Sequence, residues 1–193
     1  APKAAVRFAS PSRLGDAEPD LGAGPSPLAE AQGLGRYRRG DLIHRLLQLL
    51  PDIAAAEREA AASRLLSRER DLTAPQRAEM AAAALGAMND ARFAAVFGPG
   101  SRAEVAVAGH APGVGPISGR VDRLLVQNDR VLVIDFKTNR PAPTHIDDAD
   151  PAYIRQMAVY VAVLRTIFPD RPVEAALVWT DGPRLMPIPE ILT

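Results

Sequence analysis

One stretch, residues 117–138, constrains the fold more than any other part of this 193-residue chain. Two runs rich in Val, Ile and Leu flank Asn128 and Asp129, and both of these residue types tolerate the positive φ angles of a two-residue hairpin turn. The pattern predicts an antiparallel hairpin centred on this turn. In that register Asp122 lies directly opposite Asp135, whereas a loop with an odd number of residues would shift the pairing by one.

The opposed carboxylates predict a site for a cation. Side chains directly opposite each other in a hairpin have Cβ atoms about 4.5–5.5 Å apart, where two like charges destabilise the sheet. A fold accommodates such a pair when a cation lies between the carboxylates or when one of them is protonated. Hard oxygen ligands at this spacing suit Mg²⁺ or Mn²⁺.

Lys137 strengthens this interpretation, because it lies two residues beyond Asp135 and therefore on the same face of the strand. The 23 basic residues comprise 21 Arg and only two Lys, Lys3 and Lys137. A Lys at this position indicates a need for a compact ammonium in place of a guanidinium. Beside metal-binding carboxylates, an ammonium holds an anionic substrate and stabilises charge on a phosphoryl oxygen. The alternative interpretation is a surface hairpin whose Asp and Lys are solvated.

Composition excludes several other chemistries. The chain has no cysteine, which excludes disulfides, a thiolate nucleophile and an iron–sulfur cluster. Its 23 acidic side chains balance the basic ones, so nucleic-acid binding would depend on a local patch and not on a field of the whole chain. No secretory signal and no apolar run of about 18 residues occur, which predicts no membrane partner and a cytoplasmic location.

The chain divides at about residue 35. Ten of the first 35 residues are Pro or Gly, which predicts a flexible linker over 1–35 and a folded domain over 36–193. A start at Ala1 in place of Met adds the expectation of an excised domain. Periodicity predicts helices over 41–50, 53–69, 75–96 and 151–168, strands over 102–108, 116–127, 130–137 and 173–180, and an irregular end from Gly182. This order favours a mixed α/β fold with a sheet covered on both faces.

Further candidate residues lie on the predicted helices and near the hairpin. Gln156 and Tyr160 share one face of the 151–168 helix, and Tyr153 extends it. They suit contact with a nucleic-acid backbone or an unstacked base, or are ordinary packing residues. His44 lies in an apolar helix, as either a core residue or a ligand, and Glu104 is a possible further carboxylate. A basic rim for phosphates, or else solvated surface, is expected from Arg120, Arg123, Arg140 and Arg155.

Four short motifs in this order resemble the PD-(D/E)XK nuclease superfamily, and within it the RecB-type nuclease domain. They are Gly40-Asp-Leu-Ile-His44, Gly119-Arg-Val-Asp122, Asp135-Phe-Lys137 and Gln156-Met-Ala-Val-Tyr160. The strand 175–180 and the tail after it are similar to the C-terminal end of AddA-type helicase–nuclease subunits. The resemblance covers residues 36–193. One departure is Val121, which stands where the superfamily's name-giving proline would precede the first Asp.

The resemblance implies a restriction-endonuclease-like core of helix, three-stranded meander, helix and strand, with extra N-terminal helices. It implies roles for the candidate residues as well. The implied catalytic residues are Asp122, Asp135 and Lys137. The implied Mg²⁺ ligands are His44, Asp122, Asp135 and the Phe136 carbonyl. The implied DNA contacts are Gln156, Tyr160, Tyr153 and Arg120.

The function implied is that of a metal-dependent, exonuclease-type deoxyribonuclease acting on single-stranded DNA ends. It would belong to a bacterial AddAB/RecBCD-like helicase–nuclease that processes double-strand breaks for recombinational repair. Its partners would be a helicase domain upstream in the same polypeptide and an AddB-like subunit, and it would carry no iron–sulfur cluster. The alternatives are a catalytically silent nuclease-like module that binds DNA or a partner, and a stand-alone nuclease.

Overall fold

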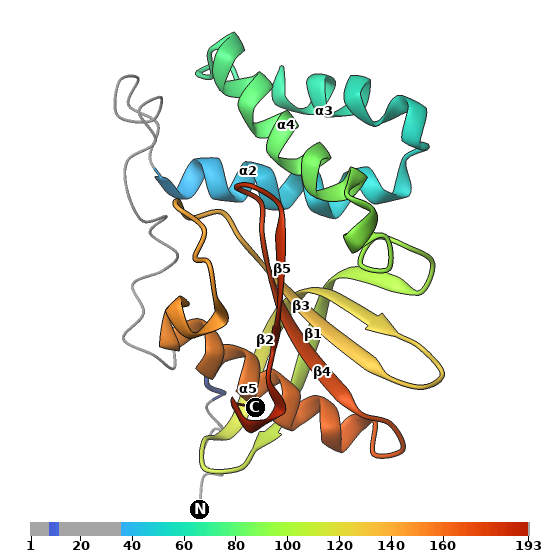
Figure 1. Cartoon of the computed structure of the whole chain (residues 1–193), viewed down its shortest axis with the longest axis vertical. Helices are drawn as coiled ribbons and strands as arrows, with labels where there is room; N and C mark the ends of the chain where they lie inside the picture. The colour runs from blue at the N-terminus through green and yellow to red at the C-terminus, as the bar shows by residue number, and fades with distance from the viewer. Residues whose placement is uncertain (1–7, 12–35, 193) are drawn as a thin grey trace, which may run out of the picture.

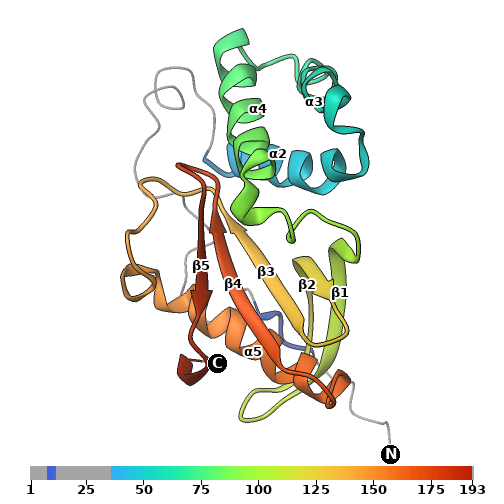
Figure 2. The same ribbon diagram turned by 45° about the vertical axis from the view of Figure 1, so that its right-hand side comes forward.

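Strand β3 (Val131–Lys137) lies at the centre of the sheet because its side chains are buried on both faces. In the computed structural model, which describes residues 8–11 and 36–192, five strands are arranged in the order β1-β2-β3-β4-β5. Strand β4 (Val173–Trp179) runs parallel to β3, and every other neighbouring pair is antiparallel. The other strands are β1 (Ser101–Ala111), β2 (Gly115–Val126) and β5 (Arg184–Ile188), seen together in Figure 2.

Helix α5 (Pro151–Ile167) is the crossover that a parallel pair requires, since it joins the end of β3 to the start of β4. It packs on one face of the sheet, where Tyr160 and Leu164 share a core with Val133, Leu177 and Trp179. Asp150 caps its first turn by accepting a hydrogen bond from the backbone N–H of Ala152 at 2.8 Å. The helix therefore begins at the residue after Asp150.

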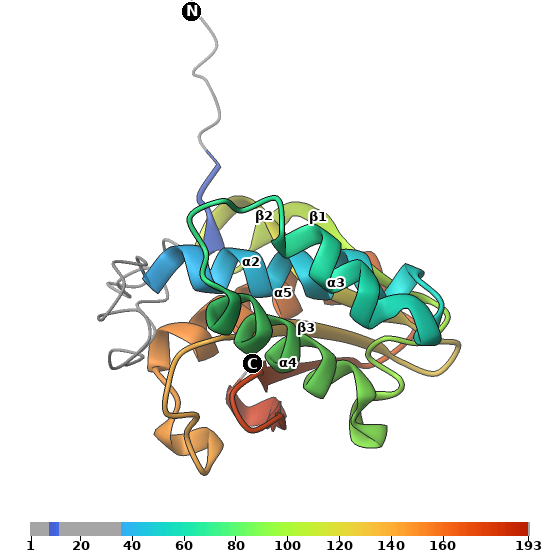
Figure 3. The same cartoon turned by 90° about the horizontal axis from the view of Figure 1, so that it is seen from above.

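Three helices form a separate layer on the other face of the sheet, at the top of Figure 1 and in front in Figure 3. They are α2 (Arg36–Leu49), α3 (Arg58–Leu66) and α4 (Ala74–Asn89). Their apolar faces share a core with the residues of β3 and β4 that point away from α5, namely Ile134, Phe136 and Val178. Short 3₁₀ turns occupy Leu50–Asp52, Ala55–Glu57, Ala91–Phe93, Ile146–Asp148 and Glu190–Leu192.

The predicted α/β class, the sheet covered on both faces and the restriction-endonuclease-like order of elements are confirmed. The prediction of an irregular end from Gly182 was wrong, because β5 pairs with β4 along its whole length. Pro187 lies in this strand opposite Ala176. An edge strand tolerates proline because only one of its sides bonds to a neighbour, so the loss of one N–H costs little there.

Most of the predicted linker over 1–35 lies outside the described residues. Residues 8–11 are described, and Ala9 forms a parallel bridge with Ile117. Its N–H donates to the Pro116 carbonyl at 2.9 Å, and its carbonyl accepts from Ser118 at 3.0 Å. Among the described residues, none of the helices combines the length and apolar character needed to cross a membrane.

Glu104 is the one non-glycine residue of the described chain in the left-handed region, with φ at +53°. It lies in β1 between Ala103, which pairs with Arg123, and Val105, which pairs with Val121. The position that would pair Glu104 with Asp122 is missing from the ladder. The backbone of β1 is thus distorted directly beside the first aspartate of the hairpin.

We expect Glu104→Gly to raise the free energy of unfolding by about 1 kcal/mol relative to Glu104→Ala, because glycine adopts positive φ without a Cβ clash. The two variants lose the same carboxylate and its ion pair with Arg120, so they differ only in this backbone cost. Urea denaturation measures the difference. Equal stability of the two variants would contradict the assigned backbone strain.

Candidate functional site

The two aspartates of the hairpin meet in the predicted register. The ladder between β2 and β3 runs from Val126 opposite Val131 to Arg123 opposite Ile134, which sets the next pair as Asp122 and Asp135. The turn is closed by the backbone N–H of Gln127, which donates to the carbonyl of Arg130 at 2.9 Å. Both the hairpin turn and the predicted strand register are therefore confirmed.

The regular ladder ends one residue before the aspartates. There the Asp122 carboxylate replaces a backbone acceptor, and its Oδ2 accepts a hydrogen bond from the Phe136 N–H at 2.7 Å. The ladder to β1 is also interrupted at Asp122. At this break in both ladders a backbone hydrogen bond from β3 fixes the Asp122 carboxylate.

His44 reaches Asp122 from α2. The apolar residues Ile43 and Leu47 anchor the helix in the core, and His44 stands at the edge of this buried face. Its Nδ1 lies 3.5 Å from Asp122 Oδ2. The helix approaches closely because residue 40 is glycine, where a Cβ would come within 3.0 Å of the Thr138 hydroxyl.

Lys137 and Asp135 form a buried ion pair on the α5 face of β3. Lys137 Nζ lies 2.8 Å from Asp135 Oδ2, and each residue is less than a tenth exposed. The ammonium also lies 3.6 Å from the centre of the Tyr153 ring, a cation–π contact. Gln156 Nε2 donates to Asp135 Oδ1 at a long 3.5 Å.

The pKa values of the two aspartates are driven apart. Burial raises the pKa of Asp122, but the charge of His44 and the Phe136 N–H outweigh it, so the net pKa is lowered. Burial also raises the pKa of Asp135, and although Lys137 opposes this, the nearby Asp122 charge adds to it and the net pKa is raised. Adjacent carboxylates with diverging pKa values are typical of functional sites.

The pKa of His44 is raised, whereas burial alone would lower it. Burial lowers it, but the charge of Asp122 and a hydrogen bond with it raise it more, to about 9. Without a metal, His44 is therefore an imidazolium at neutral pH, paired with the Asp122 carboxylate. Any cation that binds these groups competes with this proton and with the Lys137 ammonium.

Two of the predicted DNA contacts, Tyr160 and Tyr153, make contacts inside the protein. The buried Tyr160 hydroxyl donates to the Arg120 carbonyl at 3.0 Å and so ties α5 to β2. Gly119 makes this possible, because a Cβ there would lie 2.5 Å from the hydroxyl oxygen. Tyr153 supplies the ring beneath Lys137. Gln156 lies beside Asp135, so all three side chains adjoin the aspartate pair.

The expected basic rim is only partly present. Arg123 is 2% exposed and points into the helical layer, where its guanidinium donates to the Leu47 carbonyl at 3.3 Å, so its assignment to the rim was wrong. Successive side chains of a strand point to opposite faces of the sheet, so Arg123, which directly follows Asp122, points away from the site. Arg140 is held by acidic partners. Arg120 and Arg155 are exposed, and Arg120 lies 3.7 Å from Glu104.

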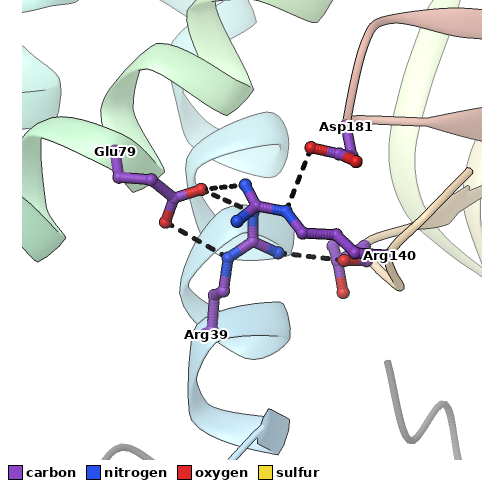
Figure 4. A network of polar contacts seen from close by, with 5 residues as sticks. Arg39, Glu79, Arg140 and Asp181 are labelled. Carbon is purple, nitrogen blue, oxygen red and sulfur yellow. Dashed lines mark hydrogen bonds and ion pairs between the residues drawn. The ribbon is translucent and has the colours of Figure 1, made fainter. Parts of the chain in front are cut away.

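The site also depends on an arginine network that sequence reasoning missed (Figure 4). Arg39 of α2 donates from Nη2 and Nε to both carboxylate oxygens of Glu79 in α4, at 2.6 and 3.2 Å, and from Nη1 to the Thr138 carbonyl at 2.9 Å. Arg140 binds the same Glu79 and forms a 3.0 Å ion pair with Asp181. Burial raises the pKa of Glu79, but the two guanidiniums outweigh it and lower the pKa.

This network joins four segments around the end of β3: α2, α4, the loop after Lys137 and the turn after β4. Its partners are 40 to 99 residues apart in the chain, so no local pattern marks them. The only nearby signal is that Arg39 precedes the glycine of the Gly-x-x-x-His motif. The network holds Thr138, and through it Lys137, against the helix that carries His44.

The residue types at this site are those that bind a divalent cation, but their side chains are not arranged around a common metal position. Within the described ranges, no three His, Cys, Asp or Glu side chains are disposed as a ready-made metal site. The carboxylates of Asp122 and Asp135 and the imidazole of His44 nevertheless lie close together, and the buried Asp135 Oδ2 has the Lys137 ammonium 2.8 Å away. In the absence of a metal, the positive charges of His44 and Lys137 balance the carboxylates that a bound cation would otherwise neutralise.

The chain is similar to proteins of one known family. The family model of the PD-(D/E)XK nuclease superfamily matches residues 19–186. Among solved structures, the crystal structure of a protein called SSO0001 aligns at 16% identity with a TM-score of 0.36, over 77% of this chain. The alignment covers 66% of that protein, a little under two thirds of its length. No curated protein matches the chain.

The His44–Asp122 pair predicts how the stability of the metal-free protein depends on pH. Folding raises the pKa of His44 from 6.5 to about 9, so the pair's contribution, up to about 3 kcal/mol, is complete below pH 6.5 and is lost as pH rises through about 9. We expect His44→Gln to remove this loss. Urea unfolding in EDTA across this pH range measures it.

His145→Gln is the matched control, because His145 is exposed in a loop. This variant should keep the slope of wild-type stability against pH. If His44→Gln keeps the slope as well, the pairing of His44 with Asp122 is refuted.

Proposed function

Because this chain belongs to the PD-(D/E)XK nuclease superfamily, we propose that it is a Mg²⁺-dependent deoxyribonuclease that hydrolyses phosphodiester bonds in DNA. The observation that carries the proposal is the pair of Asp122 and Asp135 on adjacent strands, with Lys137 Nζ 2.8 Å from the second carboxylate. Aligned carboxylates with an ammonium on the same strand face suit metal-assisted attack on a phosphate.

His44, Asp122, Asp135 and the Phe136 carbonyl would hold the Mg²⁺ ion, or Mn²⁺ in its place. Oxygen ligands predominate in this set, as both ions prefer. The raised pKa of Asp135 supports the assignment, because it indicates a buried carboxylate whose charge Lys137 compensates only in part. When bound, the metal would polarise the phosphodiester and make an attacking water more acidic.

The protein's own groups would orient the reaction. Lys137 is held between the Asp135 carboxylate and the Tyr153 ring, so its ammonium group has a fixed position. We assign it the positioning of the attacking water and the stabilisation of charge that develops on the phosphoryl oxygens. Gln156, which lies against Asp135, would keep that carboxylate oriented. A guanidinium at position 137 would be too large for this enclosed place.

The DNA strand would lie along the outer side of this group of residues. Arg120 is exposed on β2, two residues before Asp122, and suits a phosphate contact. Gln156, Tyr160 and Tyr153 would line the path of the strand, although their present polar contacts are within the protein. We propose single-stranded ends as the substrate and exonuclease-type cleavage as the activity.

The biological setting is proposed from the motif order. The Gly40–His44 helix, the Asp122 strand, the Asp135–Lys137 strand and the Gln156–Tyr160 helix follow one another as in RecB-type nuclease domains. Residues 36–193 would then be the nuclease domain of an AddAB/RecBCD-like enzyme that repairs double-strand breaks by recombination. Its partners would be an upstream helicase domain and an AddB-like subunit, in a bacterial cytoplasm.

One observation favours a second candidate function, a module that binds DNA or a partner without cutting. His44 and Lys137 already compensate the two carboxylates without a metal. A site that remains paired in this way in solution would not need a cation. Mg²⁺ titration separates the two functions, because a binding module gains nothing from the ion.

We expect Asp135→Asn to lower the rate of Mg²⁺-dependent cleavage of single-stranded DNA by about a thousandfold, since it removes one charged ligand of the proposed metal. Asp129→Asn is the matched control, because Asp129 lies exposed in the turn of the same hairpin. It should cleave at the wild-type rate. Release of nucleotides from labelled single-stranded DNA is the measurement, and cleavage by Asp135→Asn at the wild-type rate would sink the proposal.

A further inference from the structure

Strand β2 has an edge that the sheet itself leaves open beside the proposed catalytic group. It pairs with β1 along nearly all of its length, but with β3 only from Arg123 to Val126. On the side that faces β3, residues 115–121 therefore pair with no strand of the described sheet. This open edge leads directly to Asp122, and the unpaired edge of a strand readily accepts a further strand.

A short piece of the chain, residues 8–11, occupies this edge (Figure 3). Ala9 forms the parallel bridge with Ile117, and its two backbone hydrogen bonds, from its own N–H to Pro116 and from the N–H of Ser118, hold it there. Ala9 also packs against the core that α5 shares with the sheet. The segment is thus an added edge strand that the chain supplies to itself.

The pairing stops after a single bridge because residue 11 is proline. In a parallel ladder the next hydrogen bond would run from the N–H of residue 11 to the Ser118 carbonyl, and Pro11 has no N–H to donate. A strand that is paired through one bridge opens at much lower free energy than the long ladder between β1 and β2. The segment can therefore leave the edge while the sheet stays intact.

Pro11 brings the segment onto the proposed path of the DNA. It is buried, and its Cδ lies 2.9 Å from the place that a Cβ on Gly119 would take, 2.5 Å from which lies the Tyr160 hydroxyl oxygen. Tyr160, one of the proposed DNA contacts, is 2% exposed in this arrangement. Gly119 adjoins the exposed Arg120 and lies three residues before Asp122, about 10 Å along a strand. The segment therefore lies where a DNA strand would approach the aspartates.

We propose that residues 8–11 are a strap that covers the DNA path and that a DNA strand must displace. The inference rests on the proposed function, because it concerns the access of DNA to that same site. Displacement frees the Ser118 N–H, a donor that suits a phosphate oxygen, and uncovers the edge of Tyr160. The apparent affinity for DNA is then the intrinsic affinity multiplied by the fraction of molecules whose edge is open.

A disulfide that locks the strap tests this directly, because the chain has no cysteine of its own. Ser10 and Ser118, neither of them buried, are the pair that follows Ala9 and Ile117 in the register. Neighbouring strands lie about 4.8 Å apart, which is within the Cα separation that a disulfide spans. The experiment measures the binding of a labelled single-stranded oligonucleotide, in EDTA, to the whole chain carrying Ser10→Cys and Ser118→Cys.

We expect the oxidised double variant to bind the oligonucleotide at least about tenfold more weakly than the same protein after reduction. Ser118→Cys alone, taken through the same oxidation and reduction, is the matched control and should bind equally in both states. Equal or tighter binding by the cross-linked form would overturn the strap. Failure of the two cysteines to cross-link under oxidation would refute the register on which it depends.

Ala9→Pro tests the opposite direction, because it removes the N–H that donates to the Pro116 carbonyl. It should tighten the binding of the oligonucleotide about tenfold, equivalent to about 1.4 kcal/mol, which is the order of one backbone hydrogen bond. Ala9→Ser keeps the N–H and should bind with the wild-type affinity. Unchanged or weaker binding by Ala9→Pro would also overturn the proposal.

These outcomes are separate from those of the nuclease proposal, because the binding measurement contains no metal. Weaker binding by the locked chain, in a protein that cuts no DNA with Mg²⁺, would support the strap and refute the nuclease activity. Mg²⁺-dependent cleavage at equal rates by the oxidised and reduced chains would refute the strap and leave the nuclease activity standing.

Discussion

The rest of the site depends on how the fold accommodates two carboxylates, one buried and one largely buried, on neighbouring strands. At Asp122 the ladder to β3 ends and the ladder to β1 is interrupted, and the Asp122 side chain accepts a hydrogen bond from the Phe136 N–H. This hydrogen bond fixes the first carboxylate, while Lys137 compensates the second. The sheet gives up regular pairing at this point, and in return it presents two carboxylates with different pKa values to one space.

The helical layer holds this arrangement from the other side. His44 reaches Asp122 because α2 lies close against Thr138, and the bidentate Arg39–Glu79 pair fastens that contact. Arg140 joins the same Glu79 to the turn after β4. Removing Glu79 would leave two partly buried guanidiniums without their shared acceptor, so the network couples the geometry of the site to the packing of the helices.

Local sequence patterns predict the hairpin and the side chains that it brings together. The Asn128–Asp129 turn sets the register of the hairpin, and the register alone places Asp122 opposite Asp135. The spacing of two residues puts Lys137 on the same face. The placement of His44 at the site came only from the family resemblance, since a single histidine in an apolar helix does not indicate which residues it contacts.

The features that sequence reasoning missed depend on distant contacts. Strand β5 was hidden by Pro187, whose place at a sheet edge only the tertiary structure reveals. The burial of Arg123 was hidden because its partners, among them the Leu47 carbonyl, come from the separate helical layer.

The central claim is that Asp122 and Asp135 share one divalent cation. The most direct measurement is the anomalous scattering of Mn²⁺ in crystals of the protein grown with the ion. The account predicts a single strong peak about 2.0–2.3 Å from an oxygen of each aspartate, with Lys137 withdrawn from Asp135. Crystals that bind Mn²⁺ elsewhere, with His44 still on Asp122 and Lys137 still on Asp135, would contradict it.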